Sequence, residues 1–175
     1  MFENIKLEKI IDSQSISEKV KELAGMISAD YREKNPLLVC VLYGSFIFMS
    51  DIVRKIDIDI KTDFIRISSY SKGNVSEPVV LVSDISADIE NEHVIIIEDI
   101  VDTGLSVQFL QDLFLERKAG SVSCCAMIDK TERRERNVKI DYYGFRIEEG
   151  FVVGYGMDYM NLGRNLKDIY IMKNV

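Results

Sequence analysis

The sequence predicts an α/β fold in which a mostly parallel, twisted sheet is flanked by helices. Short apolar runs at residues 37–42, 94–97 and 121–128, the first of them continuously apolar, have the length of buried strands. Segments with apolar residues at helical spacing alternate with these runs. The 175 residues fit one ordinary domain, so we expect a single domain spanning residues 1–175.

The first helix is expected at residues 15–34. Ser15 and Glu18 match a capping box, in which two side chains satisfy free backbone donors at a helix N-terminus. Apolar residues then recur at helical spacing. Pro36 ends the helix, because the residue before a proline disfavours the helical conformation.

The next elements follow directly after this helix. The strand at residues 37–42 leads into a turn at 43–45 and a helix over 46–55. A second strand is expected at residues 59–69. Residues 70–78 are polar and contain glycine and proline, so they predict a mobile loop.

The second half of the chain repeats the alternation of strands and helices. Strands are expected at residues 79–82 and 94–97. A helix is expected over residues 105–118, closed by Gly120. The apolar strand at 121–128 follows it, which completes the pattern of a parallel sheet.

Charge and composition argue against several classes of function. The 29 acidic and 22 basic residues give a formal net charge of −7, which disfavours a surface that collects nucleic-acid phosphates. No apolar run approaches the roughly 20 residues of a membrane span. The first residues lack the basic-then-apolar pattern of a signal peptide. We therefore expect a cytoplasmic protein with neither nucleic-acid nor membrane partners.

The cysteines and the single histidine predict no catalytic or metal cluster. Cys40, Cys124 and Cys125 lie in apolar segments without metal-ligand spacing, so we expect reduced core residues. Cys124 and Cys125 are adjacent and would point to opposite faces of a strand. His93 is expected in a loop before a strand, and one histidine argues against a serine–histidine triad.

Residues 94–106 carry the main chemical signal, with the sequence Val-Ile-Ile-Ile-Glu-Asp-Ile-Val-Asp-Thr-Gly-Leu-Ser. Ligands of open α/β sheets bind beyond the carboxyl ends of the strands, which places Glu98 to Ser106 at the ligand end. A helix begins after Gly104, and its free N–H groups and dipole suit a phosphate monoester. Two hydroxyls in the same turn strengthen that prediction.

The acidic side chains of this segment need a different partner. Glu98 and Asp99 would repel phosphate, so they face sugar hydroxyls or a cation. Asp102 follows and is free to handle a proton at a reacting centre. A sugar with a 5′-phosphate at one end and a magnesium-bound diphosphate at the other would use all these groups. The alternative is an acidic turn in which Thr103 or Ser106 is an ordinary helix cap.

This thirteen-residue pattern resembles the signature by which phosphoribosyltransferases bind phosphoribosyl pyrophosphate. The resemblance extends over residues 35–172. Three motifs precede the signature, namely Val41-Leu42-Tyr43-Gly44-Ser45-Phe46, Asp63-Phe64-Ile65-Arg66 and Ser69-Tyr70. Two motifs follow it, Asp129-Lys130 and Phe151-Val152-Val153-Gly154-Tyr155-Gly156-Met157-Asp158-Tyr159. Together they resemble the hypoxanthine-guanine members of the purine/pyrimidine phosphoribosyltransferase family. The resemblance implies a type I phosphoribosyltransferase fold with a small hood built from the chain ends. It also implies a mobile lid loop around Ser69 and Tyr70.

The resemblance implies purine salvage, in which hypoxanthine or guanine joins phosphoribosyl pyrophosphate to give IMP or GMP and pyrophosphate. Asp102 would be the general acid/base near purine N7, and Lys130 would donate to the 6-oxo group. Phe151 would stack on the ring, and Val152 would contact its edge through the backbone. The implied ligands of phosphoribosyl pyrophosphate are Tyr43, Gly44, Glu98, Asp99, Asp102, Thr103, Gly104, Leu105, Ser106 and Arg164.

Magnesium is the cofactor that the resemblance implies. Asp158, at the purine site, would be a metal ligand, with Glu98 and Asp99 in direct or water-mediated contact. A hard cation that prefers oxygen ligands would neutralise the leaving pyrophosphate. Family members usually form dimers or tetramers, so the resemblance also implies a homodimer or homotetramer whose other partners are small-molecule substrates.

Tyr43 departs from the family pattern, which usually has lysine between Leu42 and Gly44. In the family the peptide here can be cis, and its backbone donors bind pyrophosphate. Binding through the backbone is compatible with Tyr43, whereas the cationic side chain is lost.

Two other functions stay open at this point. A transferase that prefers xanthine would share these residues, because Lys130 and Phe151 do not rank the 6-oxopurines. A non-enzymatic regulator that senses phosphoribosyl pyrophosphate would keep the sugar-phosphate site. The retained Asp102 and the acidic charge balance argue against the regulator.

Overall fold

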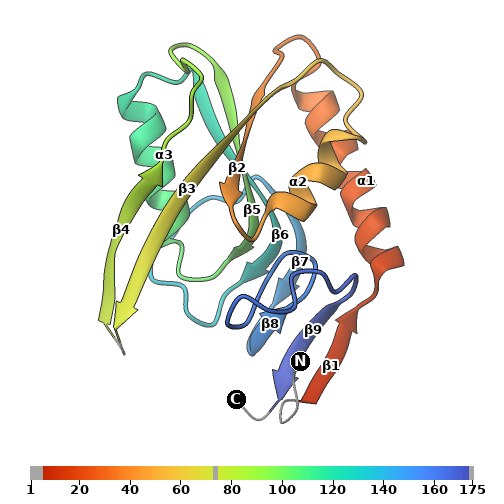
Figure 1. The fold of residues 1–175 in the computed structure, drawn as a ribbon. Coiled ribbons are helices and arrows are strands. Elements are labelled where there is room, and N and C mark those ends of the chain that lie inside the picture. Colours follow the sequence, from red (N-terminus) through yellow and green to blue (C-terminus); the bar gives the residue numbers. More distant parts are fainter. Residues whose placement is uncertain (1–5, 73–74, 174–175) are drawn as a thin grey trace.

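A six-stranded sheet forms the centre of the computed structural model (Figure 1). The structure describes residues 6–72 and 75–173, with the backbone alone described for residues 69–72 and 75–78. The strand order is β4-β3-β2-β5-β6-β7. Among these strands only β3 and β4 pair antiparallel, so the predicted mostly parallel sheet is confirmed. The strands are β2 (Leu37–Leu42), β3 (Lys61–Lys72), β4 (Val75–Ser83), β5 (His93–Val101), β6 (Ser121–Lys130) and β7 (Tyr142–Ile147).

Helices cover both faces of this sheet, which explains the continuous apolar character of β2. The helices are α1 (Ser13–Asp30), α2 (Phe46–Val53) and α3 (Leu105–Glu116). Leu38 and Cys40 pack with α1 and α2, while Leu37 and Val39 pack with α3 on the opposite face. None of the described helices is long and apolar enough to cross a membrane.

The three cysteines are free and buried, as predicted. Cys125 belongs to the core under α1 and α2, whereas Cys124 lies in a separate cluster that includes Val107 of α3. Burial raises the pKa of the Cys40 thiol to about 11. The thiols therefore act as small hydrophobic groups.

A second, three-stranded sheet forms a hood from both ends of the chain, as the family resemblance implied. Its order is β1-β9-β8, with β1 (Lys6–Ile11), β8 (Phe151–Val153) and β9 (Ile169–Lys173) all antiparallel. Figure 1 shows the hood below the carboxyl ends of the central strands. The backbone N–H of Ser13 donates to Asp168 at 2.8 Å, which ties α1 to the hood.

The predicted start and end of the first helix are wrong. α1 begins at Ser13, and its N-cap is Asp12, whose carboxylate accepts from the Ser15 N–H at 2.8 Å. The Ser15–Glu18 capping box does not form, because Asp12 already satisfies that first-turn donor. The helix ends at Asp30, several residues before Pro36.

Three further predictions are corrected by the structure. The loop expected at residues 70–78 is part of a hairpin, since β3 runs to Lys72 and β4 begins at Val75. Gly120 does not close α3, because the left-handed position belongs to Lys118 (φ 61°). His93 is the first residue of β5, where its Nδ1 lies 2.7 Å from the Ser121 hydroxyl.

Candidate active site

β5 carries the first acidic residue into the sheet instead of ending before it. The strand continues to Val101, and Glu98 pairs in register with Ala126 of β6. The Glu98 side chain is buried. This burial, and secondarily the charge of Asp99, raises the pKa of the Glu98 carboxyl well above its ordinary value. A bound cation or hydroxyl group would favour its ionised form.

Asp99 lies directly against the turn that follows β2. A Cβ atom on Gly44 would overlap the Asp99 carboxylate, so only glycine allows this contact. The peptide between Leu42 and Tyr43 is cis, the isomer that the family resemblance allowed. Burial raises the pKa of Asp99 to about 6, opposed mainly by backbone N–H groups and by Arg164. The structure thus brings together residues 43–44 and 98–99.

The loop that follows β8 contacts the turn at residues 43–44. Arg164 forms an ion pair with Asp158 at 2.6 Å and donates to the Gly156 carbonyl at 2.7 Å. A Cβ on Gly156 would overlap the Gly44 carbonyl oxygen. Because the charge of Asp158 also acts on the pKa of Asp99, the two carboxylates lie at one end of the site.

The loop after β5 enters α3 through a left-handed glycine. Gly104 has φ 84° and is the N-cap of α3, and it has no side chain to cap the first turn. The Leu105 N–H lies 3.3 Å from the Thr103 hydroxyl. The early backbone donors of α3 therefore face the end of the sheet where an anion is expected.

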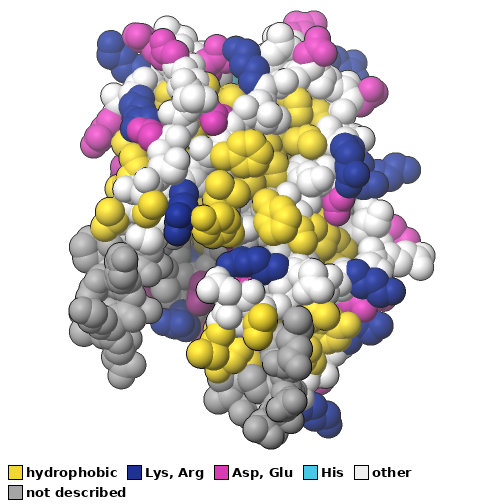
Figure 2. All heavy atoms as spheres, in the orientation of Figure 1, with side chains coloured by type: hydrophobic (Ala, Val, Ile, Leu, Met, Phe, Trp, Pro, Cys, Tyr) yellow, Lys and Arg dark blue, Asp and Glu magenta, His cyan; other side chains and the backbone are white. Residues whose placement is uncertain are grey.

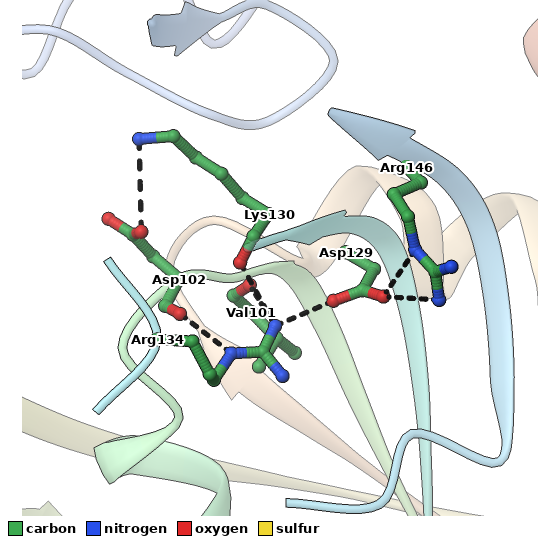
Figure 3. Close-up of polar contacts among 6 residues, drawn as sticks. All are labelled: Val101, Asp102, Asp129, Lys130, Arg134 and Arg146. Atoms are coloured by element: carbon green, nitrogen blue, oxygen red, sulfur yellow. Dashed lines mark hydrogen bonds and ion pairs between the residues drawn. The ribbon is translucent and has the colours of Figure 1, made fainter. Parts of the chain in front are cut away.

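Asp102 and Lys130 meet where the neighbouring strands β5 and β6 end. Lys130 Nζ lies 3.8 Å from Asp102 Oδ1 and 3.2 Å from the Glu132 carboxylate. Figure 3 shows the Asp102 and Lys130 side chains reaching toward each other. Asp102 Oδ1 is buried, and no described residue hydrogen-bonds to it. This oxygen is thus an acceptor available to a ligand.

Phe151 presents a ring at the start of β8, where it is 45% exposed. Its only described ring contact is the edge of Tyr159, with centroids 5.6 Å apart. Val152 is buried in the core, so its backbone is the part that a ligand would reach. The exposed part of the Phe151 ring offers aromatic surface on which a flat ligand can stack.

Tyr43, the position at which this chain departs from the family pattern, lies beside a cation. The Arg66 guanidinium carbon lies 4.8 Å from the centre of the Tyr43 ring, a cation–π distance. Arg66 pairs in register with Leu42 of the neighbouring strand. A positive charge on β3 therefore lies beside Tyr43, although the Tyr43 side chain itself carries none.

Comparison with known proteins identifies the family. The phosphoribosyl transferase domain matches residues 6–160. The chain belongs to the phosphoribosyltransferase family. Within it, the hypoxanthine-guanine phosphoribosyltransferase of Streptococcus pneumoniae strain R6 is 41% identical over 174 residues, which cover 99% of this chain and 97% of that protein. The enzyme of the same name from Bacillus subtilis strain 168 is 38% identical, covering 95% and 94%.

Solved structures of phosphoribosyltransferases share the fold. A hypoxanthine phosphoribosyltransferase from Staphylococcus aureus has a TM-score of 0.91 at 38% identity, covering 95% of this chain and 91% of that one. A hypoxanthine-guanine phosphoribosyltransferase from Bacillus anthracis, with HEPES in its active site, has a TM-score of 0.88 at 37% identity, covering 97% and 99%. The type I phosphoribosyltransferase fold predicted from the motifs is confirmed.

Two predicted features of this phosphoribosyltransferase are its lid and its metal site. Ser69 and Tyr70, expected in a lid, have backbones in β3 but side chains outside the described residues. Among the described residues, no group of three or more histidine, cysteine, aspartate or glutamate side chains forms a ready metal site. Asp99 and Asp158 offer hard oxygen donors, which fits an ion that takes its other ligands from water and substrate.

Sequence reasoning named Asp129 only as part of a motif and missed that Asp129 and Arg134 hold the site in place. Asp129 is buried, and it forms ion pairs with Arg134 at 2.6 Å and with Arg146 at 3.0 Å. Arg134 stands in the charged run after Lys130, which by itself resembles an exposed turn. The one available signal was an aspartate at the end of a buried strand, which requires a buried cation.

Proposed function

We propose that this phosphoribosyltransferase is a purine salvage enzyme that joins hypoxanthine and/or guanine to phosphoribosyl pyrophosphate, giving IMP or GMP and pyrophosphate. One observation supports it best: at the ligand end of the sheet the Lys130 ammonium lies 3.8 Å from Asp102 Oδ1, an oxygen that accepts no hydrogen bond from the described residues. Relatives matched over nearly their full length are named hypoxanthine-guanine phosphoribosyltransferases.

This pair of groups is complementary to a 6-oxopurine. The base presents an acceptor at O6 and, next to it, a donor at N7–H. Lys130 donates to O6, and Asp102 accepts the N7 proton as the bond to ribose forms. Adenine has an amino donor at position 6, which an ammonium cannot match because it only donates. Phe151 stacks on the ring, and the Val152 backbone contacts its edge.

Phosphoribosyl pyrophosphate, the second substrate, is bound both at its 5′-phosphate and at its pyrophosphate. Backbone N–H groups and hydroxyls of residues 102–106 bind the 5′-phosphate. Glu98 and Asp99 face the ribose hydroxyls. The backbone of residues 43–44 and the Arg164 guanidinium bind the pyrophosphate, because an arginine fork matches phosphate oxygens.

Mg²⁺ fits the carboxylates at the pyrophosphate end. Asp158, Glu98 and Asp99 would hold it, directly or through water, since Mg²⁺ prefers oxygen ligands. When bound, the ion neutralises the charge of the departing pyrophosphate. The ion pair between Arg164 and Asp158 keeps a protein cation at the same end.

The remaining proposals concern the whole chain. Residues 1–175 form one domain, and Ser69 and Tyr70 belong to a lid that excludes water from the electrophilic ribose. Apolar side chains that are exposed on one face of the molecule would be buried in an interface between copies of the chain, which supports a homodimer or homotetramer. A cytoplasmic location stays a prediction from the sequence.

The decisive experiment compares four bases with purified protein, phosphoribosyl pyrophosphate and magnesium. Hypoxanthine and guanine are expected to yield nucleotide and pyrophosphate, whereas adenine is not. Faster turnover of xanthine would favour the xanthine-preferring alternative, and no product from any base would favour the sensing regulator. Asp102→Asn is expected to lower kcat by about 10²–10⁴-fold, since it removes proton transfer. Full activity of this variant would remove the acid/base role.

A further inference from the structure

Arg134 binds the backbone of both residues that face the purine. Its Nε donates to the Asp102 carbonyl at 2.9 Å, and its Nη2 donates to the Val101 and Lys130 carbonyls, each at 3.0 Å. The same nitrogen lies 2.6 Å from Asp129 Oδ1. Figure 3 shows the guanidinium between the ends of β5 and β6, below the Asp102 and Lys130 side chains.

The sheet holds Lys130, which pairs in register with Ile147 of β7, but its pairing stops short of Asp102. The register between β5 and β6 ends at the pair Val101–Asp129, so Asp102 lies one residue beyond the last pair. The separation of the Asp102 and Lys130 backbones therefore depends on a group that bridges them. A planar guanidinium with a fixed fork of donors sets such a separation, because its hydrogen bonds have little geometric freedom.

Asp129 holds the Arg134 guanidinium in place. Its carboxylate is buried and is shared between two arginines, with Arg146 Nε and Nη2 at 3.1 and 3.0 Å from Oδ2. Arg146 is 57% exposed, and its other described contact is the Tyr143 ring. Arg146 thus shares the anchor of Arg134, but its side chain has no described hydrogen bond to the Asp102 or Lys130 carbonyl.

The residues after Arg134 also support the phosphate loop. The N–H groups of Glu135 and Arg136 both donate to the Thr103 carbonyl at 2.9 Å. A Cβ on Gly104 would come within 2.7 Å of the Arg136 carbonyl oxygen, so this segment packs closely against the turn. Residues 134–136 consequently contact the backbone from Val101 to Gly104.

We propose that Arg134 is a positioning residue of the active site: anchored by Asp129, it sets the distance between Asp102 and Lys130 through their carbonyl oxygens. This inference rests on the proposed function, which gives Asp102 the proton and Lys130 the purine 6-oxo group. Its consequence is that purine recognition and proton transfer depend on a side chain that touches no substrate.

Arg134 and Arg146 share the Asp129 carboxylate, so substituting each of them in turn gives a matched test of this role. Arg134→Gln is expected to lower kcat for hypoxanthine by about 10–10²-fold, because small misplacement of reacting groups has effects of that size. It should also reduce the hypoxanthine-to-adenine ratio of kcat/KM, since Lys130 is displaced. Arg146→Gln is expected to keep kcat and this ratio within about twofold of the wild type.

Arg134→Lys keeps the test informative if the glutamine variant does not fold. Lysine keeps the charge opposite Asp129, but one ammonium cannot reproduce the fork that spans both strand ends. This variant is expected to melt near the wild-type temperature and to lose at least about tenfold in kcat, with a reduced base ratio.

Several outcomes would overturn the inference. They are wild-type kcat in Arg134→Lys, an unchanged base ratio in the Arg134 variants, or an equal loss in Arg146→Gln. A wild-type protein inactive with all four bases would remove the proposed function and this inference together. An active wild type with unaffected Arg134 variants would remove this inference alone.

Discussion

At the scale of single residues, the buried acids of β5 link stability to pH. Burial raises the pKa of Glu98 well above its ordinary value and that of Asp99 to about 6, so the folded chain holds protons more tightly than the unfolded chain. An acid with a raised pKa stabilises the fold only while it is protonated. For Asp99 this contribution is lost as the pH rises from about 4 through about 6.

Asp99→Asn tests this relation. The variant is expected to unfold at a higher temperature than the wild type at pH 7.5, because it removes a buried charge. At pH 5 the difference should shrink, since wild-type Asp99 is then mostly protonated. Differential scanning calorimetry of both proteins without ligand measures the two differences. Equal differences at both pH values would contradict the raised pKa.

Tyr43 makes a different prediction, which concerns stability. The Arg66 guanidinium over its ring contributes about 0.5–1 kcal/mol at an exposed site. Tyr43→Lys removes this contact and sets two like charges together, so the melting temperature should fall by about 2–4 °C. Tyr43→Phe keeps the ring and should melt like the wild type. A stabilised lysine variant would show that the ring contact contributes nothing.

At the scale of elements, α1 depends on a cap that the sequence pattern misplaced. Asp12 accepts from Ser15 N–H, whereas Glu18 accepts from Gln14 one turn along on the exposed surface. Asp12→Ala is expected to lower the melting temperature by about 2–4 °C. Glu18→Ala is the control and should change it little, whereas the capping-box interpretation requires a comparable loss. Thermal melts followed by circular dichroism separate the two.

The hairpin of β3 and β4 carries the lid prediction. Tyr70→Ala is expected to lower kcat about tenfold or more while the melting temperature stays unchanged, because a lid excludes water without supporting the core. A second readout is hydrolysis of phosphoribosyl pyrophosphate without purine, which should rise relative to transfer. Steady-state assays measure both rates, and unchanged turnover would remove the lid.

Elements with a local signal could be predicted from the sequence. β2 appears with its expected bounds because both of its faces are buried, and the acidic loop after β5 has a distinctive pattern. The hood strands have no such signal: β8 has three residues, and β1 pairs with β9 across almost the whole chain. The role of Arg134 is also hidden, since it is made through backbone carbonyls.

At the scale of the whole molecule, the site joins segments that are far apart in the chain. The turn after β2, the end of β5, Lys130 and the loop before β9 meet between the sheet and the hood. Their contacts are made by backbone at Gly44 and Gly156, where no side chain fits. Family motifs located these segments, whereas their mutual packing required the three-dimensional structure.

One face of the molecule predicts self-association. Figure 2 shows hydrophobic side chains gathered across the middle of the face that carries β2, β3 and α2. The exposed apolar residues of the turn after β2, the start of α2, β3 and β4 are Tyr43, Phe46, Phe64, Val80 and Val82. Phe64→Asp is expected to convert an oligomer to monomers, because a charge opposes burial of this surface.

Sedimentation velocity at micromolar concentration checks the change in mass. Leu115→Asp, on an exposed position of α3, is the control and should leave the mass unchanged. A Phe64→Asp variant with the wild-type oligomeric mass would exclude this face as the interface.

The hood also orders events during protein synthesis. β9 is its middle strand, so β1 and β8 have no hydrogen-bonding partner in the hood until residues 169–173 have left the ribosome. The central sheet and its phosphate loop are complete in sequence by residue 147, but β8, which begins at Phe151, gains its pairing in the hood only with that last strand. A nascent chain still attached to the ribosome could thus acquire its sugar-phosphate site well before its purine site.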